Sequence, residues 1–174
     1  ESAISLDNFT LTRSLSAENS PYFLAGAKLT YQLNDKLELA GLMVNGWQRI
    51  QRLEGNSLPS FGTQLLYRAS DQLSFNWSTF LGTDDPDETR RMRYFSNLYG
   101  QFQVSERFEV LAGFDVGAQQ VSKGSSSYDY WWSPTLIGQY TINEAWKTAL
   151  RLEYYQDENG VIIPTFTPNG FKTT

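Results

Sequence analysis

A short turn motif that occurs four times along the chain limits the possible folds most strongly. In each copy an Asn or Ser precedes an Asp or Glu, with apolar residues at similar positions on both sides. The first residues of the four copies are Asn34, Ser70, Ser105 and Asn143, separated by 36, 35 and 38 residues. Near-even spacing of this kind indicates that one structural unit is repeated.

The segments on both sides of each motif alternate apolar and polar residues, which is the period of a β-strand. Between residues 25 and 33, Ala, Leu and Tyr fall on one side of the predicted strand, and Gly, Lys, Thr and Gln fall on the other. Each motif therefore predicts the tight turn of a β-hairpin. Longer segments rich in Gly, Pro, Asp and Ser separate the hairpins at 48–59, 83–91 and 121–128. Short turns at one end and long loops at the other predict an all-β, antiparallel up-and-down meander.

The composition excludes several classes of function. The chain has 174 residues with no Cys and no His, which removes disulfides, thiolate metal sites and the commonest general base and zinc ligand. Its net charge is −5 and its isoelectric point is about 4.7, so nucleic acid, which binds clustered Lys and Arg, is not an expected partner. We expect no enzyme activity, no metal and no cofactor.

Two kinds of fold produce this alternation. A soluble sandwich or small barrel turns its apolar side toward a core, whereas a membrane barrel turns it toward lipid. Aromatic residues make up 15% of a chain whose mean hydropathy is −0.43, and no segment approaches the roughly 20 apolar residues of a membrane helix. Aromatic residues also gather near both ends of the predicted strands, as at the two interfaces of a membrane, which favours a transmembrane β-barrel. The predicted interface aromatics are Tyr31, Trp47, Tyr67, Phe102, Trp131, Trp132, Tyr140 and Trp146.

The polar side of the predicted strands carries charges of both signs. If that side encloses a lumen, five cations and four anions face it, and so balanced a wall discriminates weakly between small anions and cations. In a narrow barrel the same charges would pair and fill the interior. The predicted lumen-lining residues are Lys28, Arg68, Arg93, Lys147 and Arg151, with Glu38, Glu109, Asp115 and Glu153.

Two stretches and one proline depart from the simple pattern. Leu42 and Val44 share a side with Glu38, and both sides of the strand at 93–104 carry aromatic residues. A bulge or a densely packed spot is expected in these stretches. Pro134 cannot donate to a ladder, so a strand is expected to begin beside it.

The loop at 84–88 contains four acidic residues. Their oxygens could hold calcium, but the spacing matches no EF-hand, and a solvated loop is the simpler interpretation. Arg90, Arg91 and Arg93 follow at once. These arginines could contact lipopolysaccharide phosphates or neutralise the neighbouring acids.

The number of strands decides whether a barrel holds a channel, because about 8 strands leave an interior that side chains fill and 16 or more leave a water-filled lumen. We expect eight well-supported strands and a ninth at 8–16, within a range of about 8–10. Bacterial barrels have an even number, so either a tenth strand forms from Val161 onward or further strands lie outside this sequence. We expect residues 1–174 to form a single β-barrel domain, or part of one that is incomplete at both ends.

Three segments together resemble a known family. The hairpin at 31–37, the strand end at 44–47 and the stretch at 150–160 resemble, in order and spacing, the OmpL-like β-barrel porins of bacterial outer membranes. The similarity extends over about residues 8–160. The resemblance implies a barrel in the bacterial outer membrane that passes small solutes and touches membrane lipid and lipopolysaccharide. It implies no catalytic residue.

Two functions remain compatible with these patterns. The first is porin-like passive diffusion of small solutes through the barrel. The alternative is a closed structural or recognition barrel whose long extracellular loops bind a partner, either a second copy of the chain or another membrane protein. Conductance measurements separate the two, because only the first gives ohmic current steps.

Overall fold

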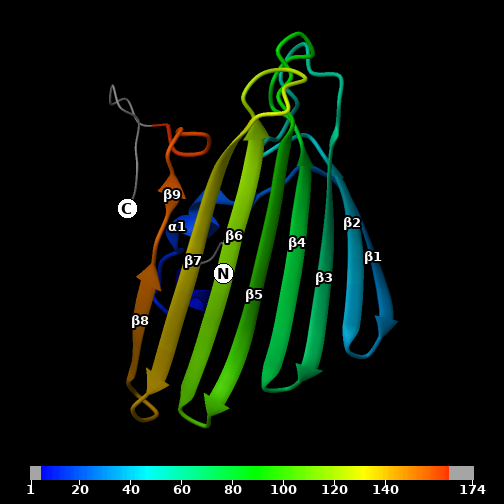
Figure 1. The fold of residues 1–174 in the computed structure, drawn as a ribbon. Helices are drawn as coiled ribbons and strands as arrows, with labels where there is room; N and C mark the ends of the chain where they lie inside the picture. The colour runs from blue at the N-terminus through cyan, green and yellow to red at the C-terminus, as the bar shows by residue number, and fades with distance from the viewer. Residues whose placement is uncertain (1–4, 165–174) are drawn as a thin grey trace.

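Strands dominate the computed structural model of the chain, which describes residues 5–164 (Figure 1). The elements are η1 (Ser5–Asp7), α1 (Leu15–Asn19), β1 (Gly26–Asn34), β2 (Leu37–Val44), β3 (Ser60–Ser70), β4 (Leu73–Gly82), β5 (Arg93–Ser105), β6 (Phe108–Gln120), β7 (Tyr128–Thr141), β8 (Lys147–Glu153) and β9 (Gln156–Asp157). None of the helices in residues 5–164 has the length and apolarity needed to cross a bilayer.

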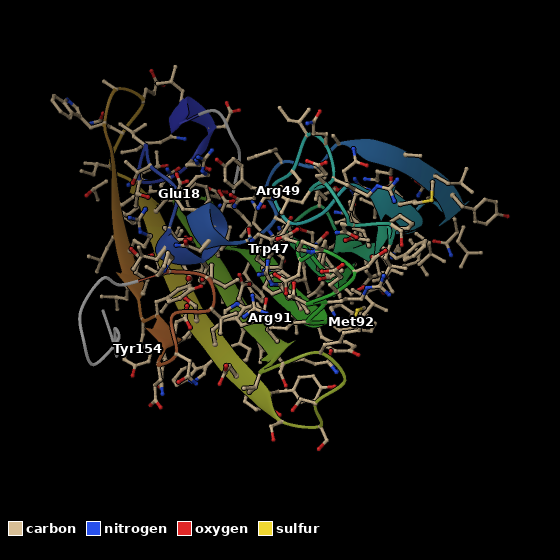
Figure 2. All side chains as sticks on the ribbon, turned by 90° about the horizontal axis from the view of Figure 1, so that it is seen from above. Glu18, Trp47, Arg49, Arg91, Met92 and Tyr154 are labelled. Atoms are coloured by element: carbon tan, nitrogen blue, oxygen red, sulfur yellow. The ribbon has the colours of Figure 1, made fainter. Side chains whose placement is uncertain are left out.

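The strands form one antiparallel sheet in which neighbours in the chain are neighbours in space, from β1 to β8. The short β9 pairs with β7 and continues the edge that β8 begins. Seen from the loop end, the sheet is a curved wall with α1 on its concave side (Figure 2). Among the described residues β1 pairs only with β2, and β8 only with β7, so the wall does not close on itself. The predicted all-β meander is confirmed.

The repeated motif forms the four short turns, and its first residue holds each turn through a side-chain acceptor. Asn34 Oδ1 accepts hydrogen bonds from the backbone N–H groups two and three residues further on, at 2.9 and 3.0 Å. Asn143 Oδ1 does the same, also at 2.9 and 3.0 Å. Ser70 and Ser105 use their hydroxyl oxygens, at 3.2 Å in the first case and at 3.3 and 3.1 Å in the second. Short polar side chains that bind the backbone locally are therefore the physical reason for the repeat.

The distribution of apolar and polar side chains is the reverse of that in a soluble protein. On the convex face Leu29 is 79% exposed, Trp77 48% and Phe114 45%. On the concave face the polar Asn76 and Asp115 are only 2% and 4% exposed. The apolar side of the strands thus faces outward, and the soluble alternative, which needs that side in a core, does not describe this chain.

The segment at 8–16, predicted as a strand, is not one. Leu11 has φ +58°, which breaks an extended chain, and Ser14 Oγ caps α1 by accepting from the N–H of Ala17 at 3.2 Å. A serine cap favours a helix start over continued strand pairing. This prediction is wrong, and the segment lies instead against the concave side of β7 and β8.

The strand expected to begin beside Pro134 starts six residues earlier, at the first residue of β7, so this prediction is also wrong. The carbonyl of Pro134 accepts from the N–H of Tyr154 at 3.2 Å, in the break between β8 and β9. The N–H that proline lacks would point to the same break. In this break the hydroxyl of Ser133 donates to the Tyr154 carbonyl at 2.7 Å, in place of the backbone N–H that Pro134 lacks.

The predicted tenth strand from Val161 does not form in its described part. The backbone N–H groups of Val161, Ile162 and Ile163 donate to the fully buried carboxylate of Asp157 at 2.8 to 2.9 Å. A turn wrapped around one carboxylate replaces an extended segment. The remainder of that predicted strand lies outside the described residues.

Candidate functional site

Polar and charged side chains gather on the concave face of the sheet, which is therefore the candidate site. Three zones follow one another from the long loops to the short turns. We call them the loop-end cluster, the middle cavity and the turn-end groove. The first is apolar, the second is polar with Asp115 as its one charged lining residue, and the third carries charges of both signs.

The loop-end cluster consists of Val44, Trp47, Phe80, Phe95, Trp131 and Tyr155. Trp47 lies at its centre and meets Phe80, Phe95 and Trp131 edge-on, with ring centroids 5.2, 5.0 and 5.9 Å away. A Cβ on Gly117 would lie 1.9 Å from the Trp131 ring, so only glycine leaves that ring its place. The densely packed spot predicted near Val44 and Phe95 is confirmed.

Two of the predicted interface aromatics are corrected by this cluster. Trp47 is 7% exposed and Trp131 1%, and both lie on the concave face, so neither can belong to a girdle that faces lipid. Trp47 lies within the curve of the wall when seen from the loop end (Figure 2). The sequence placed both correctly near the long loops but on the wrong side. Five of the other six project from the convex face: Tyr31, Tyr67, Phe102, Trp132 and Tyr140. Trp146 lies just before β8 and is 68% exposed, and the contact of all six with a membrane interface stays a prediction.

On β1 to β4 the concave wall is a chain of hydrogen bonds. Lys28 Nζ donates to Gln64 Oε1 at 2.8 Å, and Gln64 Nε2 donates to Asn76 Oδ1 at 2.8 Å. Asn76 then donates to Ser78 Oγ at 2.9 Å. Glu38 lies on the same face toward the short turns, two positions beyond the buried Ala40. The Lys28 ammonium is thus hydrogen-bonded to the first of a row of uncharged polar groups.

On β5 and β6 each predicted wall carboxylate has an amide partner. Asn97 donates to Asp115, and Gln101 donates to Glu109. Arg68 of β3 lines the turn-end groove, a hollow of about 740 Å³ that also includes Glu109. These positions agree with an inward-facing wall, and the lining of a lumen by them stays a prediction.

The segment before β1 covers the β7 and β8 side of the wall. Ser16 Oγ donates to Ser133 Oγ at 2.6 Å, and the N–H of Leu15 donates to Glu153 Oε2 at 2.6 Å. Arg151 pairs with Glu153 at 3.1 Å and also donates to the Thr10 hydroxyl at 2.9 Å. Arg151 and Glu153 therefore bind this segment, whereas Lys147 is exposed.

Sequence reasoning missed this lining segment. The available signal was a helix start: Ser14 precedes a short run containing Leu15 and Ala17, and Pro21 follows. Serine at the first position and proline shortly after the end are typical of a helix. The apparent alternation of residues at 8–16, which is typical of a strand, concealed this helix start.

The middle cavity lies between this segment and the wall and has a volume of about 290 Å³. Uncharged polar side chains dominate its lining, among them Gln64, Asn76 and Asn97 from the wall and Ser16 and Ser20 from the segment. Its size is close to the lower limit for small-molecule sites, about 300 Å³.

The long loops tie down the wall above the cluster. Arg93, a predicted lumen residue, pairs with Asp84 at 3.0 Å and places its guanidinium 5.1 Å from the Trp47 ring centroid. Asp84 also accepts from the backbone N–H of Trp47 at 2.9 Å. The Arg93 side chain is only 11% exposed, so Arg93 supports the cluster and does not line an open passage.

The acidic loop pairs with the arginines that follow it. Arg91 contacts Asp85 at 2.7 Å; burial raises the pKa of Asp85, but the hydrogen bonds and charge of Arg91 outweigh it and lower that pKa. Asp87 accepts from the N–H of Ser57 and from Arg90, which lowers its pKa to about 2. Neutralisation, one of the two sequence interpretations, is the arrangement found. Within residues 5–164 no group of three or more His, Cys, Asp or Glu is placed to hold a metal ion.

Comparison with known proteins agrees with the fold. No curated protein and no solved structure matches the chain. One family model, described as "Putative beta-barrel porin-2, OmpL-like", matches residues 1–174, the whole of the sequence. Porin-like barrels of this kind are generally not enzymes. The resemblance seen in the three sequence segments is confirmed, and the chain belongs to this OmpL-like family of β-barrel porins.

Proposed function

We propose that the protein is a pore of the bacterial outer membrane through which small solutes diffuse passively along the concave face. One observation carries the proposal: the apolar side chains are exposed on the convex face, while polar ones are buried on the concave face. Membership of the porin-like family supports the outer-membrane location. Membrane lipid, with lipopolysaccharide in the outer leaflet, is the proposed partner of the convex face.

The energetics favour this orientation over its reverse. Placing apolar side chains such as Leu29 and Leu150 in lipid removes them from water, which is worth about 25 cal/mol per Å² of apolar surface. A lysine such as Lys28 turned toward the middle of the bilayer would cost about 2–4 kcal/mol. The edges of the sheet must also be paired in the membrane, because lipid cannot satisfy free backbone groups. The proposal therefore includes strand partners for β1 and β8.

Passage in this proposal needs no chemistry. Three of the four predicted wall carboxylates are engaged, through the Asn97 to Asp115 and Gln101 to Glu109 hydrogen bonds and the pair of Arg151 with Glu153. Groups held in this way act as a polar surface for solutes and water. The width of the passage then sets what passes, because the turn-end groove carries charges of both signs and discriminates weakly between anions and cations.

The test is reconstitution of the full chain, folded in detergent, into liposomes and planar bilayers. The proposal expects ohmic current steps in KCl and swelling of liposomes in small neutral solutes. Circular dichroism of the same sample provides the control that the strands are formed. A β-rich sample that gives silent bilayers and no swelling would contradict passive diffusion.

The alternative, a closed recognition barrel, is favoured by one specific observation. The loop-end cluster packs Trp47 and Trp131 across the concave face directly under two loops that the Asp84 to Trp47 N–H hydrogen bond joins. Such packing would close the loop end and leave the loops as a binding surface. Silent bilayers from well-folded protein would support this alternative.

A further inference from the structure

We infer that the middle cavity binds uncharged polyhydroxylated solutes, with room for a single sugar ring, and that Tyr99 is the residue that contacts them. This inference deepens the proposed function and rests on it, because it names the class of solute that the concave face selects. It starts from the position of Tyr99 among the hollows of this face.

Three hollows of the concave face meet at Tyr99. Its side chain lines the middle cavity, the turn-end groove and a third hollow of about 250 Å³ that is bounded by Asn8 and Phe9. Tyr99 lies in the middle of β5, paired with Asn76 of β4 and Gly113 of β6. Because Gly113 has no side chain to cover the ring, a solute moving between the middle cavity and the groove passes the Tyr99 ring.

The lining of the middle cavity has the chemistry of a sugar site. Wall amides from Gln64 and Asn97 and the hydroxyl of Thr135 supply uncharged donors and acceptors. Aromatic side chains of Phe95 and Tyr99 supply apolar surface for the C–H groups of a sugar ring. Sites with an apolar lining and a few placed polar groups are typical for small molecules.

Charge in the cavity favours neutral solutes over anions. Of the described residues that line it, Asp115 is the single carboxylate, and there is no Lys or Arg among them. A hydroxyl group can donate to this carboxylate, whereas an anion would be repelled by it. By contrast, Lys36 and Arg68 line the turn-end groove together with Glu109, so that zone does not select by the sign of charge.

The volume of the middle cavity limits the part of a solute that it holds to one ring. About 290 Å³ is at the lower limit of small-molecule sites. Residues Ser16 and Ser20 of the segment before β1 line the cavity on the side away from the wall. A longer saccharide would extend past Tyr99 into the turn-end groove, because the segment held by the Ser16 to Ser133 hydrogen bond bounds the cavity on the other side.

The test is isothermal titration calorimetry on the detergent-folded full chain, with glucose and glucuronate as the probes. We expect glucose to bind and glucuronate to bind at least about tenfold more weakly, because it meets the Asp115 charge. Tyr99→Phe removes one hydroxyl and should weaken glucose binding about fivefold. The control Tyr67→Phe makes the same change on the convex face and should bind as the wild type does.

A second variant keeps the test decisive if Tyr99→Phe folds poorly. Asp115→Asn keeps the size of the side chain and an acceptor for Asn97 but removes the charge, so the preference for glucose over glucuronate should shrink about tenfold. Glucuronate binding as tightly as glucose, or an unchanged preference in Asp115→Asn, would overturn the inference. So would the absence of any glucose binding.

Calorimetry does not depend on conduction, so it can contradict the proposed solute site without contradicting passive diffusion, and conductance measurements can do the reverse. Conducting channels with no glucose binding would overturn the site alone. Glucose binding with silent bilayers would support the site and contradict passive diffusion.

Discussion

The two ends of the hairpins are held together in different ways. At the short-turn end, each turn is stabilised by the side chain of its own first residue, as in the 2.9 and 3.0 Å hydrogen bonds that Asn34 accepts. At the long-loop end, contacts join residues far apart in the sequence, as where Asp84 accepts from the N–H of Trp47. Local side-chain hydrogen bonds thus set the repeat, whereas long-range packing fixes the loops over the concave face.

The largest expected effect separates two tryptophans at opposite ends. Trp47→Ala empties the centre of the loop-end cluster and should lower the free energy of unfolding by about 3–5 kcal/mol. Trp146, at the short-turn end, is 68% exposed, so Trp146→Ala should cost clearly less. Equilibrium denaturation of both variants in detergent measures the difference. Equal losses of unfolding free energy would contradict the distinction between the two ends.

The next effect concerns the ion pairs of the long loops. Asp84→Asn leaves the buried Arg93 without its carboxylate and should cost about 2–3 kcal/mol. The control, Asp85→Asn, breaks a pair in which the side chain of Arg91 is 42% exposed, and should cost about 0–1 kcal/mol. The denaturation midpoints of the two variants measure these losses of stability. A larger loss in Asp85→Asn than in Asp84→Asn would contradict the assignment of Asp84 to a structural role.

A smaller effect is expected at the short turns. Asn34→Ala removes the acceptor of two backbone N–H groups and should cost about 1 kcal/mol. Asn34→Asp keeps an acceptor at the same place and should lose less. Refolding and unfolding of the two variants under the same conditions provide the measurement. If Asn34→Ala is as stable as the wild type, the motif does not hold the turn.

The smallest effect is the pH dependence of the Asp87 contacts. Its pKa falls from 3.8 to about 2 because it accepts from Ser57 and Arg90. A depressed pKa in the folded state means that the stabilisation is present above pH 3.8 and is lost as the pH falls through about 2. The wild type should therefore exceed Asp87→Asn in denaturation midpoint at neutral pH, and the difference should vanish between pH 4 and 2. A difference that persists below pH 2 would contradict this cause.

The sequence predicted the sheet well because its signals were local. The turn motif and the alternation of residues on strands such as β1 needed no knowledge of distant contacts. Trp131 was assigned to the wrong face because both of its neighbours in the sequence are aromatic, so alternation does not distinguish the two sides. Trp47 was assigned wrongly because β2 ends at Val44 and Gly46 has φ +141°, so the alternation does not extend to it. Pro134 was misjudged because the break between β8 and β9 that accommodates it is formed by another part of the chain.

The candidate site was predicted only in part. Charged residues on the polar side, such as Lys28 and Asp115, were placed correctly on the concave face by the period of two. Their partners were not predicted, because Gln64 and Asn97 are uncharged and carry no distinctive sequence signal. The sequence did not single out Tyr99, because its proposed contact with solutes follows from the hollows that meet around it.

The orientation of the two faces is the central claim, and single-cysteine labelling in liposomes tests it most directly, because the chain has no cysteine of its own. Trp77→Cys and Ser78→Cys place a bimane fluorophore on adjacent residues of β4 that point to opposite faces. Brominated lipid should quench the label at position 77, and aqueous iodide should quench the label at position 78. Quenching by lipid at 78 and by iodide at 77 would contradict the claim.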